Sequence, residues 1–180
     1  MTWQNDTLAV ACTTAQLAHC SPQTACAPLG SPSRACLAGD ADGIRSVAPT
    51  VLRSYLGVPH SYLLIHAAAE SGHDKCIAAL AECGAGATIG AVTDDGRTAA
   101  SFAAENGHAS CLAELVVQGA AYMFSTADTT LQRTPAHYAA TEGFASCIEV
   151  LAKGGAEATL TALDEDGCTA ATLAAGQGGC

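Results

Sequence analysis

The stretch Ala-Ala-Glu-Ser-Gly-His at residues 68–73 returns as Ala-Ala-Glu-Asn-Gly-His at 103–108 and as Ala-Ala-Thr-Glu-Gly-Phe at 139–144. A weaker copy, Ala-Ala-Gly-Gln-Gly-Gly, stands at 174–179. The glycines that these copies share lie 35, 36 and 35 residues apart: Gly72, Gly107, Gly143 and Gly178. A fixed period of this length is typical of stacked-repeat proteins, in which each unit buries its apolar face against its neighbours.

Each unit has the pattern of two short helices. In the clearest copy, Thr134 and Pro135 begin a helix, because Pro suits the first helical position and the Thr hydroxyl can accept a free backbone N–H. Gly143 ends this helix, and a second helix with an apolar stripe runs up to Gly154-Gly155. Helices joined by about two residues are antiparallel neighbours. The same frame predicts helix pairs near 64–71 and 74–83, 99–106 and 109–118, and 135–142 and 145–153.

These motifs resemble the ankyrin repeat. The resemblance rests on Thr134-Pro135-Ala136-His137, on the Ala-Ala-x-x-Gly-His stretches, on the closing Gly-Ala pairs, and on Asp95-Gly96-Arg97-Thr98 and Asp166-Gly167-Cys168-Thr169 before the first helices. It implies an all-α, ankyrin-type helix-pair solenoid with long connecting loops. Leu63-Leu64 replaces the Thr-Pro pair of the second unit, Ser101 and Thr172 replace the histidine, and Gln132 replaces the turn glycine.

The resemblance also implies a division of the chain. Residues 1–32 are an N-terminal segment with a Pro- and Ser-containing linker, and residues 33–180 are ankyrin repeats. The expected units are a degenerate repeat at 33–60, repeats at 61–93, 94–129 and 130–163, and a truncated repeat at 164–180.

Composition excludes some classes of function. The net charge of −10 argues against nucleic-acid binding, which depends on Lys and Arg contacts to phosphate. No apolar run approaches the roughly 20 residues of a membrane span, and the N-terminus lacks the pattern of a signal peptide. We therefore expect an intracellular protein, cytoplasmic or nuclear, without a membrane span.

Ten cysteines invite a metal or disulfide interpretation. Three of them, Cys76, Cys111 and Cys147, each follow the repeat glycine by four residues and so share one position on the second helix. Free cysteine at such a position serves as a small hydrophobic residue, so we expect these thiols to be reduced and buried in one column. The remaining cluster of Cys12, His19, Cys20, Cys26 and Cys36 lacks the paired spacing of structural zinc sites.

The histidines also have positions in the repeat frame. His66 and His137 share the fourth place of the first-helix motif, and the resemblance implies a structural, hydrogen-bonding role for both. His73 and His108 follow the repeat glycine and are interpreted as framework residues. No histidine has a cysteine or serine partner that the repeat frame would bring into a catalytic arrangement. We expect no enzymatic activity, no metal and no cofactor.

Acidic turns stand before the third and fifth units, at Asp94-Asp95 and at Asp164-Glu165-Asp166. An acidic turn is most often only solvated. These turns recur at the same phase of the repeat, however, so they are expected to stack along one edge. Loops on one edge of a solenoid are often the binding face.

The resemblance implies a protein–protein interaction module that binds a partner protein through a concave surface of loops and first helices. The expected partner-binding residues are Tyr62, Glu70, Ser71, Asp94, Asp95, Arg97, Glu105, Asn106, Thr130, Arg133, Thr141, Glu142, Glu165 and Asp166. Because carboxylates dominate this set, the partner is expected to present a basic or mixed-charge segment. The competing interpretation is a regulatory or targeting ankyrin segment of a larger multidomain protein, such as an enzyme or a channel.

Overall fold

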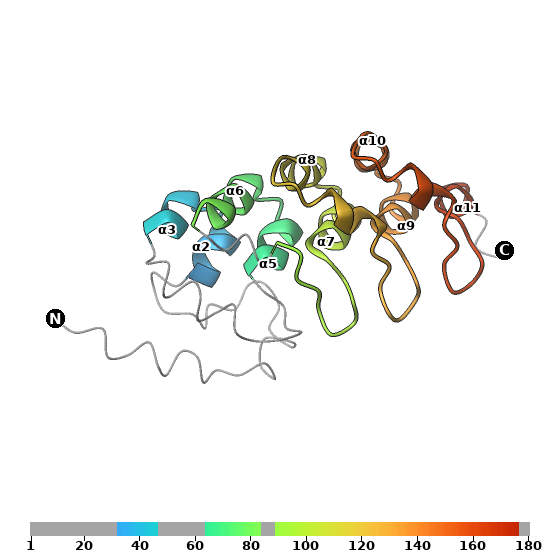
Figure 1. Cartoon of the computed structure of the whole chain (residues 1–180), viewed down its shortest axis with the longest axis horizontal. Coiled ribbons are helices and arrows are strands. Elements are labelled where there is room, and N and C mark those ends of the chain that lie inside the picture. Colours follow the sequence, from blue (N-terminus) through green and yellow to red (C-terminus); the bar gives the residue numbers. More distant parts are fainter. Residues whose placement is uncertain (1–31, 47–63, 84–88, 177–180) are drawn as a thin grey trace.

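The computed structural model describes residues 32–46, 64–83 and 89–176. Its helices follow one another in pairs along an elongated stack (Figure 1). The first helices of the units are α2 (Pro32–Ala38), α5 (Leu64–Glu70), α7 (Ala99–Glu105), α9 (Pro135–Thr141) and α11 (Ala170–Ala174). The second helices are α3 (Ala41–Ser46), α6 (Asp74–Glu82), α8 (Ala109–Val117) and α10 (Ala145–Lys153). Two 3₁₀ helices, η3 (Ala121–Ser125) and η4 (Glu157–Thr161), follow α8 and α10.

The six helices expected from the repeat frame are confirmed, each within one residue of its predicted end. The glycine after each first helix explains the sharp turn into the second helix. Gly72, Gly107 and Gly143 have φ angles of 78°, 76° and 78°, a left-handed conformation that glycine adopts without steric cost. Segments 1–31 and 47–63, which include the second half of the expected degenerate repeat, lie outside the described residues.

A pair of polar residues caps the N-terminus of α7, of α9 and of α11. Thr98 and Ser101 form a reciprocal capping box in α7, and Thr169 with Thr172 does the same in α11. In α9 the partner is His137, whose Nδ1 accepts from the backbone N–H of Thr134 at 3.1 Å. Ser101 and Thr172, which replace the histidine of the motif, therefore keep its capping role.

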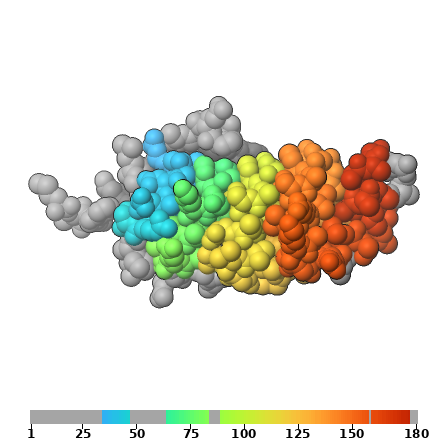
Figure 2. Space-filling model, turned by 90° about the horizontal axis from the view of Figure 1, so that it is seen from above, coloured from blue at the N-terminus to red at the C-terminus, as the bar shows by residue number. Residues whose placement is uncertain are grey.

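First helices pack on first helices, and second helices pack on second helices. Contacts join α2 to α5, α5 to α7, α7 to α9 and α9 to α11, while α3, α6, α8 and α10 form a parallel row. The layered order is continuous from one end of the stack to the other (Figure 2). The alanines of the repeated motif, small enough to let the helices approach closely, are buried at this interface: Ala68, Ala69, Ala103, Ala104, Ala139 and Ala140.

Candidate functional site

Three loops project from the same side of the stack, each just before a first helix (Figure 1). They span residues 89–98, 126–134 and 162–169, and each closes through one backbone hydrogen bond across its base. The closing bonds run from the N–H of Thr93 to Arg97 O at 2.9 Å, from Asp128 to Arg133 O at 3.0 Å and from Asp164 to Cys168 O at 2.9 Å. Between its two closing residues the middle loop holds one residue more than the others, and its Gln132 has a φ of 54°, where Gly96 and Gly167 have 79° and 76°.

In each loop the first of the two closing residues has a buried side chain that accepts hydrogen bonds from the backbone of the turn. The Asp128 carboxylate accepts from the N–H groups of Leu131 at 2.6 Å and Thr130 at 2.9 Å, and the Asp164 carboxylate accepts from Cys168 N–H at 2.8 Å. Burial opposes ionisation of both carboxylates, but these hydrogen bonds outweigh it and hold the pKa of Asp128 and of Asp164 below its usual range. In the first loop Thr93 has this place, and its hydroxyl accepts from Arg97 N–H at 3.1 Å.

The expectation of a purely solvated acidic turn was therefore wrong for Asp164. Glu165 and Asp166 are exposed, but Asp164 is buried and organises the backbone of its loop. Sequence reasoning also missed Asp128. The signal was present, because Thr93, Asp128 and Asp164 are 35 and 36 residues apart and all carry side-chain acceptors.

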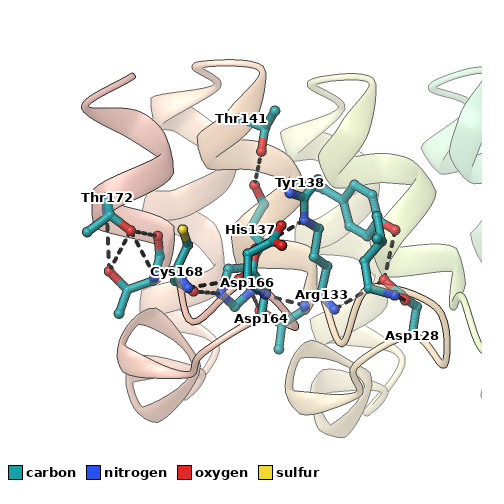
Figure 3. Close-up of polar contacts among 12 residues, drawn as sticks. Asp128, Arg133, His137, Tyr138, Thr141, Asp164, Asp166, Cys168 and Thr172 are labelled. Atoms are coloured by element: carbon teal, nitrogen blue, oxygen red, sulfur yellow. Dashed lines mark hydrogen bonds and ion pairs between the residues drawn. The ribbon is translucent and has the colours of Figure 1, made fainter. Parts of the chain in front are cut away.

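The loops stack on one another, as their common phase in the repeat predicted. Thr129 N–H donates to Asp95 O at 2.8 Å, and Glu165 N–H donates to Leu131 O at 2.9 Å. An ion pair reinforces the second junction, because Arg133 Nε lies 3.3 Å from Asp164 Oδ2 (Figure 3).

Arg97 lies between two aromatic rings from consecutive repeats. Its guanidinium carbon is 4.2 Å from the centroid of Phe102 and 4.6 Å from that of Tyr138, and it forms an ion pair with Glu105. The Tyr138 hydroxyl donates to Asp128 at 2.8 Å, so the cluster reaches the middle loop (Figure 3). Burial, together with this bond to a carboxylate, raises the pKa of Tyr138 to about 12.

The histidines join each repeat to the next part of the stack. His66 Nε2 is 3.0 Å from Ala91 O, and His137 Nε2 is 3.1 Å from Ala162 O. Because His137 Nδ1 accepts from a backbone N–H, its Nε2 carries the proton and donates to this carbonyl. Burial of the His66 ring lowers its pKa to about 4, so His66 is neutral at pH 7. The structural interpretation of both residues is confirmed.

The residue after each repeat glycine covers the glycine of the preceding repeat. The ring of His73 lies over Gly39 and that of His108 over Gly72, each within 3 Å of where a Cβ would stand. His73 Nε2 is 3.2 Å from Leu37 O, and His108 Nε2 is 3.0 Å from Glu70 O. Both carbonyls lie at the ends of first helices, where no helical N–H reaches them. These histidines are framework residues, as predicted.

The comparison with protein families agrees with this geometry. Residues 65–115 match the family model described as ankyrin repeats (many copies). These residues are ankyrin repeats. No curated protein matches the chain in the sequence comparison.

The repeat framework places the predicted partner-binding residues along the loops and first helices, with different exposure. Exposed members are Glu70, Asp94, Asn106, Thr130, Thr141, Glu142, Glu165 and Asp166. Half-buried members are Ser71, Asp95, Arg97, Glu105 and Arg133. Tyr62 lies outside the described residues. The assignment of these residues to a partner remains a prediction.

The cysteine column of the second helices is confirmed. Cys76, Cys111 and Cys147 are free and fully buried, and burial raises the pKa of each thiol, to about 12 for Cys111. Cys36 is also free and buried, whereas Cys12, His19, Cys20 and Cys26 lie outside the described residues. In the part of the chain that the structure describes, no helix has the length and apolarity of a membrane span.

Proposed function

We propose that this chain is a protein-binding module that recognises a partner through the loops and first helices of its ankyrin repeats. Ankyrin repeats generally bind proteins, and stacked repeats offer extended concave surfaces for this purpose. The three loops support the proposal because backbone bonds from Thr129 to Asp95 and from Glu165 to Leu131 fix them as one row. A preorganised surface loses less conformational entropy on binding.

The observation that carries the partner chemistry is the negative charge of the loops. On the loops, the exposed acidic and basic side chains are the carboxylates Asp94, Glu165 and Asp166. The two cations of the loops are engaged internally, Arg97 with Glu105 and two rings, and Arg133 with Asp164. Both lysines of the chain lie on second helices, Lys75 in α6 and Lys153 in α10. The loop side is therefore negative without compensation, which favours a basic or mixed-charge partner segment.

The carboxylates are expected to act together and mainly on the rate of association. Each exposed ion pair contributes about 0–1 kcal/mol, so no single carboxylate decides the affinity. A row of like charges raises the rate at which an oppositely charged partner arrives, and salt screens this effect over about 8 Å at physiological ionic strength.

Two matched variants test this proposal. The loop variant Asp94→Asn/Glu165→Gln/Asp166→Asn removes three exposed carboxylates and leaves Asp95, which accepts a hydrogen bond from Thr93. The control Glu82→Gln/Glu149→Gln/Glu157→Gln removes three exposed carboxylates from α6, α10 and η4. Both change the net charge equally.

Proteins captured on the wild-type chain are identified, and association rates are then measured with the purified partner at several salt concentrations. We expect the loop variant to associate several-fold more slowly, with a flatter salt dependence, and the control to resemble the wild type. Equal behaviour of the two variants would place the interface elsewhere.

The proposal includes no catalytic role and no cofactor. The buried thiols of the cysteine column have raised pKa values and are poor nucleophiles at pH 7. Native mass spectrometry of the purified protein tests whether a cofactor is bound, because a bound metal or organic group would add mass to the chain.

A further inference from the structure

Two exposed leucines lie on consecutive loops, Leu131 in the turn of the middle loop and Leu163 just before Asp164, where the third loop closes. Leu131 is 39% exposed and Leu163 is 61% exposed. Turns favour Gly, Asn, Asp and Ser, each of which stabilises the turn by its backbone freedom or its hydrogen bonds. In the loop-to-loop hydrogen bonds, Leu131 stands where the first loop has Asp95. Neither turn chemistry nor burial within the described residues accounts for an apolar side chain at this place.

The two leucines lie at one junction between the loops. Leu131 O accepts from Glu165 N–H at 2.9 Å, and Leu163 lies two residues before Glu165, a span of at most about 7 Å along the chain. Single exposed apolar residues are common on soluble proteins. Two of them at one loop junction, with the exposed polar residues Thr130, Glu165 and Asp166 near them in the chain, are instead a candidate contact site.

Resting on the function proposed above, we infer that Leu131 and Leu163 form an apolar anchor for the partner, which is a basic segment with apolar side chains between its cations. The charge of the loops selects the basic segment, because their exposed acidic and basic side chains are all carboxylates. The leucines give the affinity that screened surface charges do not, since burying apolar surface is favourable and insensitive to salt screening.

Two synthetic peptides test this inference on the full chain. One alternates Lys and Leu over eight residues, and the other alternates Lys and Ser. Fluorescence anisotropy measures the affinity of each labelled peptide. We expect the wild type to prefer the Lys-Leu peptide by about tenfold or more, and Leu131→Ser/Leu163→Ser to reduce this preference to about twofold or less without weakening Lys-Ser binding.

A matched control removes two other exposed apolar side chains. Val117 in α8 and Tyr122 in η3 are 75% and 62% exposed and belong to helices outside the three loops. Val117→Ser/Tyr122→Ser is expected to keep the preference for the Lys-Leu peptide. Circular dichroism checks that both variants remain folded.

The outcomes separate this inference from the proposed function. If Leu131→Ser/Leu163→Ser keeps the full preference, or the control loses it equally, the anchor is overturned. The proposed function then survives as long as Lys-Ser binding is weakened by the loop variant Asp94→Asn/Glu165→Gln/Asp166→Asn. If the wild type binds neither peptide at millimolar concentration, the anchor and the basic partner segment are both overturned.

Discussion

Helices α7 and α11 are built on the same motif but have different surroundings. In α7 both alanines of the repeated pair, Ala103 and Ala104, are fully buried, whereas their counterparts at the end of α11, Ala174 and the C-cap residue Ala175, are exposed. The reason is the number of neighbours: α7 packs between α5 and α9, while among the described first helices α11 packs on α9 alone. Burial of a first helix is therefore supplied by the adjacent repeat, and the same residues contribute different stability in the middle and at the end of the stack.

The largest effect expected from this difference concerns Phe102 and its counterpart Leu173. Phe102 is buried against His66 and Arg97, whereas Leu173 is half-buried. We expect Phe102→Ala to lower the free energy of unfolding by about 3–5 kcal/mol and Leu173→Ala by about 1 kcal/mol. Urea unfolding followed by circular dichroism measures both. Equal losses would contradict the assigned role of the neighbouring repeats.

The next effect is a pH dependence of the free energy of unfolding, caused by the buried His66 in the interior of the stack. The pKa of His66 is about 4 in the folded chain, below the ordinary value of 6.5. Between these values the unfolded chain binds a proton that the folded chain does not, so His66 favours unfolding as pH falls from 6.5 towards 4. We expect a loss of up to about 3 kcal/mol.

Unfolding experiments at pH 7.5 and pH 4.5 on the wild type and on His66→Gln isolate this contribution, because the other titrating groups are common to both proteins. The loss of stability on acidification should be smaller in the variant. An identical loss in both proteins would show that His66 is not the responsible group.

A substitution at the buried Cys147 should cost more stability than one at its exposed neighbour Ser146. Cys147 is fully buried in α10, so Cys147→Ser places a hydroxyl where no partner is assured. We expect a loss of about 1–3 kcal/mol, against less than about 0.5 kcal/mol for the exposed control Ser146→Ala. Thermal unfolding of the two variants decides the point, and a neutral Cys147→Ser would argue against a tightly packed cysteine column.

The smallest effect concerns the middle loop. Gln132 holds a φ of 54° without being glycine, whereas the two flanking loops have glycine at this turn. Relief of this conformation in Gln132→Gly is partly offset by the greater freedom of glycine in the unfolded chain, so we expect a gain of about 0.5–1 kcal/mol. A lower melting temperature in this variant would show that the side chain of Gln132 has another stabilising contact.

The helix pairs could be predicted from the sequence because local signals fix them. Proline or threonine begins a helix, glycine ends it, and the 35- to 36-residue period repeats both signals. The buried roles of Asp128 and Asp164 could not be predicted as directly. They depend on several backbone N–H groups converging on one carboxylate, which a charge pattern in the sequence does not reveal.

The internal contacts of the two loop arginines also could not be predicted from the sequence. Arg97 meets Tyr138 from the next repeat, and Arg133 meets Asp164 from the following loop. Such contacts between residues about 30–40 positions apart follow from the distance between stacked units. The sequence showed which residues line the loop side, and the structure was needed to show which of their charges face solvent.

Hydrogen exchange monitored by mass spectrometry tests most directly whether neighbouring repeats supply the stability of each unit. The account predicts that amides in residues 165–176 exchange well before those in residues 99–153, because α11 has a single first-helix neighbour among the described residues. Equal protection of the two regions would contradict it.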